Sequence, residues 1–528
     1  MKQKIIELIR KVVPKETVIE ITVPENSKFG DYSTNVAFSL AKIKNKSPLV
    51  LAEEIRKKIL STKPAILKKI EVASPGFINF FLSDKAYETV LKEILKSQKN
   101  YGRGGKRKEK ISLDYLDANP TGPVHLGHAR GGLYGDVLSN VLEFAGYKVS
   151  REFYVNNAKS SGQIKSLGAT ALGKGKEYEH DQLLSLLKKP SVKSALKKIK
   201  LESEAGAYIA KLIQKENENF LEKKAKIHFN LFFSEESIYQ KKLIEKLLTE
   251  LHEKNLVYKK DGALWFIAKS YGDSEDRVFV RSDGTPTYVL PDLVYHLDRL
   301  RSRKYEKVID IFGADHHGYG PRLKGALSAL GVNRERVEVL IAQTVRLTKN
   351  GKEFKMSKRE GVFVTLEELI KQVGLDVARF FFITVSLDTH FDFDFMLAKK
   401  HSLKNPVYYV QYAIVRAENI LKKAKNNPAI AGPASDFKSL TTKEDKQLIL
   451  ELGRFPEVIE DTARDYRLHR LTKYAGELAR AFHNFYQKER VIGEAKEKAA
   501  ARLALVTATI IVLKNLFGVL GISTPKKM

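Results

Sequence analysis

The sequence contains no cysteine, and only one tryptophan and four methionines occur among its 528 residues. Without thiols, the chain has no disulfide framework, no zinc or iron–sulfur site built on cysteine, and no catalytic thiol. Acidic residues are also in short supply, because 63 Asp and Glu stand against 92 Lys and Arg and leave a formal net charge of +29. A globular chain this basic indicates a polyanionic partner, either a nucleic acid or an anionic membrane surface.

Long hydrophobic runs are equally scarce. The best candidate, residues 503–513, ends at Lys514 and is well short of the roughly 20 residues that a spanning helix needs. We therefore expect a buried helix there and no membrane partner. Residues 1–16 have the pattern of an amphipathic helix and include Glu7 and a single Arg10, unlike a signal or transit peptide, so we expect a cytoplasmic protein.

The composition predicts several folded domains, because 43% of the residues are hydrophobic and 29% are charged, and a domain takes about 150 residues. We expect a multidomain α/β protein. The predicted segments are a small α+β N-terminal domain (1–100), a basic glycine-containing linker (101–110), a Rossmann-like parallel-sheet domain (111–396) with a helical insertion (about 157–260), and an all-α C-terminal domain (397–528). The linker's five basic residues fit a solvated hinge or, alternatively, a strip that contacts phosphates.

A strand–helix–strand pattern opens the predicted central domain. Residues 111–116 are mostly apolar, residues 127–146 have helical spacing and end at Gly146, and residues 148–155 again have strand character. Such a βαβ unit belongs to a parallel sheet, which binds ligands beyond the carboxyl ends of its strands. The loop before the helix is therefore the expected ligand site.

One segment and two histidine pairs resemble known phosphate- or metal-binding sites. Residues 168–175, GATALGKG, resemble a phosphate loop but have glycine where Ser or Thr is required, and we expect a helix end there. The pair His316–His317 and the pair His125/His128 could suggest a metal, but no cysteine or matching carboxylate spacing accompanies them. No protein-bound metal is expected.

The loop and helix start at residues 118–128, ANPTGPVHLGH, carry the most informative motif. His125 and His128 lie on one helical face, where backbone N–H groups and the helix dipole already attract anions. The imidazoles can donate hydrogen bonds to phosphate oxygens, and Gly127 lets a base or ribose approach the backbone. A purely structural role for both histidines in capping and packing is the alternative.

A second motif, GKEFKMSKREG at residues 351–361, is a glycine-flanked basic segment. Taken alone it is typical of a solvated loop. Following an HxGH motif in the same chain, however, its Lys-Met-Ser-Lys sequence resembles the second signature of class I aminoacyl-tRNA synthetases. The chain has KMSKR where the general signature is KMSKS.

Further segments resemble one family of that class, the arginyl-tRNA synthetases. FGDYSTNVAF (29–38) and PGFINFFL (75–82) resemble its extra N-terminal domain. DANPTGPVHLGHARGGLYGD (117–136), VRSDGTPTYVLPDLVYHLDRL (280–300) and FGADHHGYGPRLKGAL (312–327) resemble its catalytic domain, and ELARAFHNFYQKERVI (477–492) resembles its helical anticodon-binding domain.

This resemblance implies activation of L-arginine by ATP to arginyl-adenylate, followed by transfer of arginine to the 3′-terminal adenosine of its tRNA. The partners implied are the tRNA for arginine, L-arginine and ATP with its Mg²⁺, and a monomer is expected. The implied catalytic residues are His125, His128, Lys355 and Lys358. The implied ATP-binding residues are these four with Gly127, Met356 and Ser357, and the implied arginine-binding residues are Asn119, His128, Tyr288, Asp292 and His316, with His317 open as the alternative to His316.

Two other functions stay open at this point. A catalytically inactive tRNA-binding paralogue would not need both signatures. An activating enzyme for another amino acid, with cysteine the nearest relative, would be expected to hold a zinc thiolate, which a chain without cysteine cannot supply. The aspartate that follows TYVLP, Asp292, also favours a cationic substrate.

Overall fold

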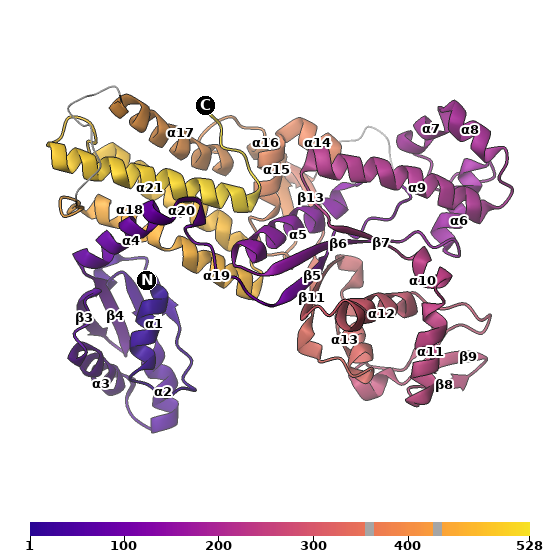
Figure 1. Ribbon diagram of the computed structural model, residues 1–528, viewed down its shortest axis with the longest axis horizontal. Helices are drawn as coiled ribbons and strands as arrows, with labels where there is room; N and C mark the ends of the chain where they lie inside the picture. The colour runs from indigo at the N-terminus through magenta and orange to yellow at the C-terminus, as the bar shows by residue number, and fades with distance from the viewer. Residues whose placement is uncertain (354–363, 426–435) are drawn as a thin grey trace.

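The computed structural model describes residues 1–353, 364–425 and 436–528. Figure 1 shows an elongated molecule, with the N-terminal domain at the lower left and the C-terminal helices above it. The central sheet lies in the middle, and two lobes extend from it to the right, one above the other.

The N-terminal part is built on a four-stranded antiparallel sheet in the order β1-β2-β4-β3. The strands are β1 (Ile21–Thr22), β2 (Tyr32–Thr34), β3 (Leu67–Ala73) and β4 (Phe77–Leu82), and the helices are α1 (Lys2–Arg10), α2 (Val36–Lys44), α3 (Pro48–Ser61) and α4 (Asp84–Ser97). Alternation of buried and exposed positions is weak in β4, where most residues are buried. The combination of an antiparallel sheet with helices agrees with the predicted α+β character of the first hundred residues.

The central sheet is five-stranded and parallel throughout, in the order β12-β11-β5-β6-β7. Its strands are β5 (Lys110–Asp114), β6 (Lys148–Val155), β7 (Leu231–Ser234), β11 (Lys307–Gly313) and β12 (Val337–Ala342). The direction of the strand order reverses between β5 and β11, so this is a doubly wound sheet with its switch point at those two strands. The predicted Rossmann-like sheet is confirmed.

Helix α5 (Leu126–Phe144) connects β5 to β6 and completes the predicted βαβ unit. The helix lies very close to the sheet, because a Cβ atom at Gly135 would come within 2.3 Å of the ring of Tyr115. Leu133, Val137 and Leu138 on the same helix are fully buried. The start of α5 is thereby fixed beside the carboxyl end of β5.

The segment 157–260 departs from the all-helical prediction. It contains α6 (Gly162–Ala171), α7 (Asp181–Lys188), α8 (Pro190–Leu196), α9 (Glu202–Phe220), α10 (Glu236–Gln240) and α11 (Leu243–Glu253), but also the strands β7 and β8 (Val257–Lys260). The prediction of helix through residues 231–234 is wrong, since Leu231–Ser234 pairs with β6 as the edge of the central sheet. The expected helix end at residues 168–175, the segment that resembles a phosphate loop, is confirmed, because α6 ends at Ala171.

The lower right lobe in Figure 1 packs α11, α12 (Val289–Leu297) and α13 (Tyr319–Ala329) beside a small antiparallel sheet of β8, β9 (Ala263–Phe266) and β10 (Arg277–Val280). Asp261 and Gly262, both in the left-handed region, turn β8 into β9, and an Asp-Gly pair is typical of such a hairpin turn. After β12 the chain forms β13 (Val345–Lys349) and β14 (Lys352–Glu353), and β13 pairs with β15 (Phe391–Asp394).

The remaining described chain is helical, as predicted. It forms α14 (Leu366–Val373), α15 (Leu375–Phe382), α16 (Phe395–Ala398), α17 (Pro406–Lys425), α18 (Lys443–Gly453), α19 (Phe455–Asp465), α20 (His469–Lys488) and α21 (Lys496–Leu520). Within the described ranges α21 is one helix long and apolar enough to cross a membrane, but 67% of its most apolar window is buried. The expectation of a buried helix at residues 503–513 is confirmed.

The basic segment 101–110 has no regular structure up to Glu109 and most of its residues are exposed, as expected, but two of its side chains anchor it to neighbouring domains. Tyr101 is 3% exposed and stacks on Phe455 of α19. The guanidinium of Arg107 pairs with Glu460 of the same helix at 2.7 Å and covers the ring of Tyr147. The segment therefore joins the central domain to the C-terminal helices.

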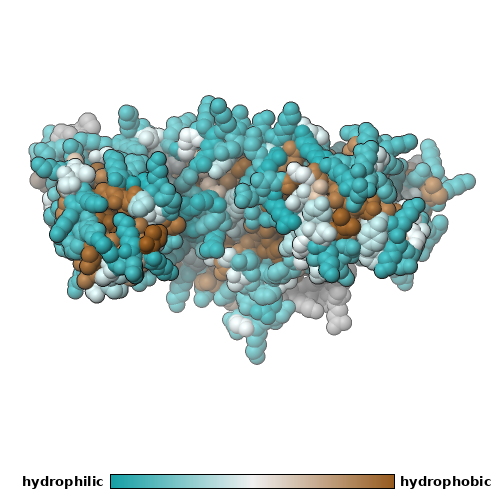
Figure 2. All heavy atoms as spheres, turned by 90° about the horizontal axis from the view of Figure 1, so that it is seen from below, coloured by the Kyte–Doolittle hydropathy of each residue, from teal (hydrophilic) through white to brown (hydrophobic). Residues whose placement is uncertain are grey.

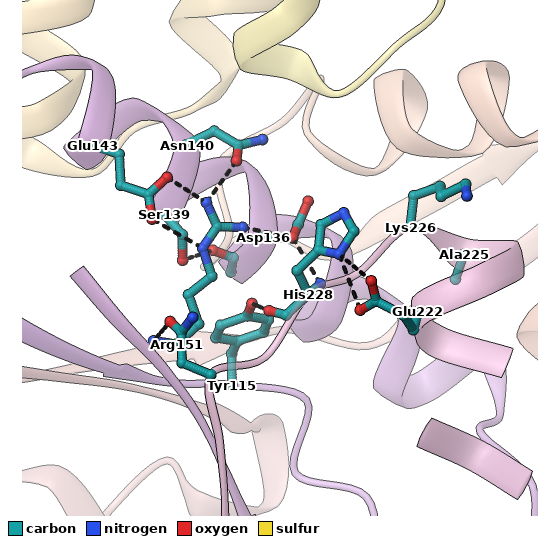
Figure 3. A network of polar contacts seen from close by, with 12 residues as sticks. Tyr115, Asp136, Ser139, Asn140, Glu143, Arg151, Glu222, Ala225, Lys226 and His228 are labelled. Atoms are coloured by element: carbon teal, nitrogen blue, oxygen red, sulfur yellow. Dashed lines mark hydrogen bonds and ion pairs between the residues drawn. The ribbon is translucent and has the colours of Figure 1, made fainter. Parts of the chain in front are cut away.

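A buried polar cluster ties α5 to its surroundings (Figure 3). Asp136 on α5 pairs with Arg151 of β6 at 3.0 Å and with Arg379 of α15. Arg151 also binds Glu143 at 2.7 Å, and Arg379 donates to the carbonyl oxygen of Leu520 at the end of α21. Removing one partner of a buried pair costs about 3–5 kcal/mol, so this cluster fixes α5 against both the sheet and the C-terminal helices.

The surface seen from below in Figure 2 is largely hydrophilic, with apolar surface exposed at the left, over the N-terminal domain, and also to the right of the centre. Ile43 and Val50 of that domain are 72% and 51% exposed.

Candidate active site

A large cleft of about 1350 Å³ lies at the carboxyl ends of the central strands. All the described residues that the sequence predicted for the site line this cleft: Asn119, His125, Gly127, His128, Tyr288, Asp292 and His316. His317 is not among its lining residues. Lys355, Met356, Ser357 and Lys358 lie outside the described residues. Residues far apart in sequence thus meet where a doubly wound sheet is expected to bind its ligand.

The two histidines of the HxGH motif form one surface at the start of α5. Their rings stack with centroids 3.5 Å apart, and His125, the N-cap residue, accepts a hydrogen bond at Nδ1 from the backbone N–H of Gly127 at 3.1 Å. A Cβ at Gly127 would come within 2.9 Å of the His125 ring. Glycine is therefore required for this ring position.

Both imidazoles are held neutral. Burial lowers the pKa of His125. Burial, together with the repulsion that a protonated His125 would exert, lowers the pKa of His128 to about 3. Nδ1 of His128 is buried and has no hydrogen-bond partner among the described residues. A neutral imidazole has one donor and one acceptor nitrogen, so these rings can hydrogen-bond a ligand without carrying charge.

The segment that follows residue 363 holds the helix start in place. The N–H of Leu126 donates to the carbonyl of Val364 at 2.8 Å, and the N–H of Leu366 donates to the carbonyl of Val124 at 2.9 Å. Thr365 caps α14 with a capping box that includes Glu368. This ladder fixes the backbone on either side of His125.

Asp292 supplies the negative charge of the opposite wall. Its carboxylate accepts a hydrogen bond from the hydroxyl of Tyr319 and lies 3.7 Å from Nδ1 of His296. Burial raises the pKa of Asp292, although the neighbouring His296 and Tyr319 oppose that shift. A bound cation would relieve the cost of leaving this carboxylate desolvated.

A buried network of hydrogen bonds and ion pairs lies behind Asp292. His296 contacts the Asp292 carbonyl oxygen at 2.8 Å and the Asp310 carboxylate at 2.9 Å, and Asp310 also pairs with Arg299. Burial by itself lowers the pKa of His296, but the charge and hydrogen bond of Asp310 together with the charge of Asp292 outweigh burial and raise the pKa. Both ring nitrogens then act as donors, which fixes the start of α12 and with it the position of Asp292.

Glu235, which the sequence analysis missed, is a second carboxylate of the cleft. Burial raises its pKa to about 7, and the charge of Asp292 adds to the shift. Because two carboxylates that oppose each other's ionisation attract a cation strongly, this part of the cleft suits a positively charged group. Glu235 directly follows β7, and recognition of that short strand would have pointed to it.

The other predicted residues frame this pocket. Asn119 accepts a hydrogen bond at its side-chain oxygen from Asn156 at 2.8 Å, and Tyr288 is 57% exposed with its ring 5.6 Å from that of Tyr319. His316 lies with Nε2 3.8 Å from the carboxylate of Asp117. Across the parts of the chain that the structure describes, no group of three or more His, Asp or Glu residues could hold a metal ion.

The cleft therefore has two chemically different halves. The carboxylate half contains Asp292, Glu235, Tyr288 and Tyr319 and lies by the ends of β6 and β7, whose Tyr154 and Phe233 pack on Tyr295 of α12. The helix-start half contains His125, Gly127 and His128. It also contains Ala342, the last residue of β12, and Gln343 and Thr344, which follow that strand. One half suits an organic cation and the other suits phosphate groups.

Comparison with known families covers almost the whole chain. Residues 1–82 match the arginyl tRNA synthetase N-terminal domain, residues 90–380 match the catalytic domain of class I (R) tRNA synthetases, and residues 410–528 match the DALR anticodon-binding domain.

Curated relatives agree with this assignment. Arginine–tRNA ligase 1 of Halalkalibacterium halodurans is 40% identical over 552 residues, covering 97% of this chain and 95% of the relative. Arginine–tRNA ligase of Bacillus subtilis is 40% identical over 533 residues, covering 97% and 94%.

Solved structures show the same architecture. An arginyl-tRNA synthetase from Campylobacter jejuni superposes with a TM-score of 0.76 at 32% identity, covering 85% of this chain and all of that one. The Thermus thermophilus arginyl-tRNA synthetase superposes over the full length of both chains with a TM-score of 0.82 at 22% identity, a likeness of fold.

Proposed function

This chain belongs to the arginyl-tRNA synthetase family and charges the tRNA for arginine with arginine, and on that premise we propose how its residues divide the reaction. The observation that carries the proposal is the two-sided cleft, with buried carboxylates in one half and a helix start bearing neutral histidines in the other. Arginine occupies the carboxylate half, and ATP occupies the helix-start half. The reacting carboxylate and α-phosphate then meet between the two.

Asp292 and Glu235 hold the guanidinium. A guanidinium presents planar N–H donors that can bind a carboxylate at two points. Tyr319 fixes the rotamer of Asp292 by its hydroxyl hydrogen bond, and Tyr288 covers the pocket. A site with these buried polar groups discriminates strongly against amino acids that leave them unpaired.

Asn119, His128 and His316 hold the amino-acid end of the substrate near the helix start. All three line the cleft. Asn119 is positioned by its hydrogen bond from Asn156, and His316 by the nearby carboxylate of Asp117. This placement leaves the arginine carboxylate free to face the phosphates.

Activation needs no protein nucleophile. An oxygen of the arginine carboxylate attacks the α-phosphorus of ATP, the bond to the β-phosphate oxygen breaks, and pyrophosphate leaves. A hydroxyl of the 3′-terminal adenosine then attacks the carbonyl carbon of arginyl-adenylate, and AMP leaves. The protein aligns these groups and stabilises charge on the phosphate oxygens.

His125 and His128 supply that stabilisation from the start of α5, as hydrogen-bond donors at the positive end of the helix dipole. Gly127 lets the nucleotide approach. Lys355 and Lys358, with Met356 and Ser357, form the proposed second ATP-binding segment. Mg²⁺ arrives bound to ATP, since this metal is usually held through phosphates and waters.

The other domains bind tRNA in this proposal. The N-terminal domain (1–100) contacts the body of the tRNA, residues 101–110 form the linker to the catalytic domain (111–396, with the insertion at 157–260), and the helical domain (397–528) binds the anticodon. The excess of basic residues supports this, because backbone contacts from Lys and Arg dominate affinity for nucleic acids. We propose a monomer that acts in the cytoplasm.

His128→Ala tests the catalytic assignment. Loss of one preorganised donor costs about 2.7–4 kcal/mol, so arginine-dependent ATP–pyrophosphate exchange, measured with tRNA present, should fall about 100- to 1,000-fold. tRNA binding, measured by filter retention, should remain within a few-fold of the wild type. A folded variant with near-normal exchange would contradict the role of His128.

A further inference from the structure

Arg130, five residues after His125 on α5, is fully buried. Its guanidinium donates from Nη1 to the carbonyl oxygens of Gln343 at 2.9 Å and Thr389 at 2.6 Å, and from Nη2 to the carbonyl oxygen of Ser386 at 2.7 Å. These acceptors are all backbone carbonyls from two loops that are distant in sequence. The side chain therefore connects the helix of the HxGH motif to both loops.

Arg130 has no carboxylate partner among the residues that the structure describes. The other fully buried arginines, Arg299, Arg379 and Arg502, each pair with an aspartate. A buried guanidinium bonded only to backbone carbonyls gains little from charge pairing. Its contribution comes from the fixed directions of its planar donors.

The two loops that Arg130 joins are also bonded to each other. The N–H of Gln343 donates to the carbonyl of Leu387 at 3.0 Å, and the N–H of Phe391 donates to the carbonyl of Thr344 at 3.1 Å. The hydroxyl of Thr344 contacts Nδ1 of His390 at 3.0 Å. The result is a paired loop unit, residues 342–344 with 386–391, whose inner side is held by Arg130.

One member of this unit forms part of the cleft wall. Ala342, Gln343 and Thr344 line the cleft in the helix-start half, together with His125, Gly127 and His128. The pairing of Ala342 with Gly313 holds one end of this wall in the sheet. Arg130 links the rest of the wall directly to the histidines, because it extends from the same helix that begins with the HxGH motif. A displacement of the loops would widen the helix-start half and leave the carboxylate half unchanged.

We propose that Arg130 is a positioning residue for ATP: its planar guanidinium holds residues 342–344 at the spacing from His125 and His128 that the nucleotide requires. The proposal deepens the proposed function and depends on the assignment of ATP to the helix-start half. Arg130 touches no substrate, and it acts through the carbonyl oxygens of Gln343, Ser386 and Thr389.

The test is the kinetics of Arg130→Lys in the full-length protein, with ATP and arginine varied separately at saturating tRNA. Lysine keeps the positive charge but cannot reach three carbonyls in two loops with a planar fork. The KM for ATP should rise about tenfold or more, which corresponds to about 1.4 kcal/mol. The KM for arginine should stay within about twofold, a split that general loss of structure would not produce.

Two further variants make the result decisive. His390→Ala removes the contact to Thr344 from an exposed position, and it should raise the KM for ATP in the same direction by a smaller factor. Arg502→Lys changes a buried arginine of the C-terminal helices, and it should lower the melting temperature without changing the KM for ATP. If Arg130→Lys does not fold, the KM for ATP of His390→Ala alone tests the proposal.

An unchanged KM for ATP in folded Arg130→Lys would overturn the proposal, because a positive charge without the planar guanidinium would then be enough to position residues 342–344. An equal rise in both KM values would also overturn it. If the wild type charges no arginine onto tRNA but binds ATP, and Arg130→Lys weakens that binding, the proposed function fails and the positioning of ATP stands.

Discussion

Tyr319 donates its hydroxyl hydrogen to the carboxylate of Asp292, and the tyrosine ring is only 4% exposed. The carboxylate itself keeps 20% of its side-chain surface open towards the cleft. The tyrosine thus fixes one oxygen of Asp292 and leaves the other for a ligand. The first two predictions concern this pocket.

Asp292→Asn should impair the use of arginine and spare that of ATP. The amide oxygen can still accept the Tyr319 hydrogen bond, so packing should change little, but the negative charge is lost. Breaking one side of a buried charge pair costs about 2–5 kcal/mol, which lowers kcat/KM for arginine by about 30- to 5,000-fold. Steady-state charging assays that vary arginine and ATP separately measure this.

Asp298→Asn is the matched control, since Asp298 immediately follows α12, the helix of Asp292, and pairs with Arg303 outside the cleft. Its kinetics should resemble the wild type. A loss of ATP affinity in Asp292→Asn with an unchanged KM for arginine would show that Asp292 does not bind the guanidinium.

Glu235 should make arginine binding depend on pH. Because the pKa of Glu235 in the empty pocket is about 7, the carboxylate is charged above that pH and neutral below it. The kcat/KM for arginine should therefore rise between pH 6 and pH 8. Glu235→Gln should flatten this rise and lower kcat/KM at pH 8 by about ten- to 150-fold, the value of a hydrogen bond to a charged group.

A matched variant separates this effect from general charge loss near the cleft. Glu236→Gln alters the next residue, whose carboxylate accepts a hydrogen bond from the backbone of Lys159. It should keep the rise with pH, moved to lower pH, because the charge of Glu236 contributes to the raised pKa of Glu235. A pH profile that is unchanged in Glu235→Gln would exclude Glu235 from the arginine pocket.

The buried histidine at the helix start should weaken the protein in acid. The folded-state pKa of His128 is about 3, whereas an unfolded histidine titrates near 6.5. Between these values the unfolded chain binds more protons, so stability rises with pH through that range and falls as the solution is acidified. The lowered pKa of His128 should reduce the free energy of unfolding by about 2 kcal/mol at pH 5 relative to pH 7.5.

His128→Asn removes the titrating group and should reduce that acid loss, as measured by urea unfolding at the two pH values. His252→Asn, an exposed histidine on α11, serves as the control and should leave the loss as in the wild type. An identical acid loss in His128→Asn and the wild type would mean that His128 is protonated in the folded protein.

The sequence predicted those parts of the fold that are local. The strand–helix–strand unit around α5 could be recognised because its apolar spacing, its glycine after the helix and its Pro/Gly loop all lie within one short segment. The cleft residues followed from two motifs and a family resemblance. The structure then brought Asp292 and His128 to one cleft from positions far apart in the chain.

The parts that the sequence did not predict depend on long-range pairing. Leu231–Ser234 is a four-residue strand between helices, and only its pairing with β6 makes it part of the sheet. Because this strand was not predicted, Glu235, which directly follows it, was not recognised as a residue of the cleft. Arg130 was missed for a similar reason, because nothing near it in sequence indicates that its side chain ends among carbonyls of residues 343, 386 and 389.

The most direct test of the central claim is to offer the purified full-length protein total tRNA, ATP with Mg²⁺, and each labelled amino acid separately, and to count the label retained on tRNA. The account predicts incorporation of arginine alone, and its loss in Asp292→Asn. Incorporation of a different amino acid, or of none by the folded wild type, would contradict it.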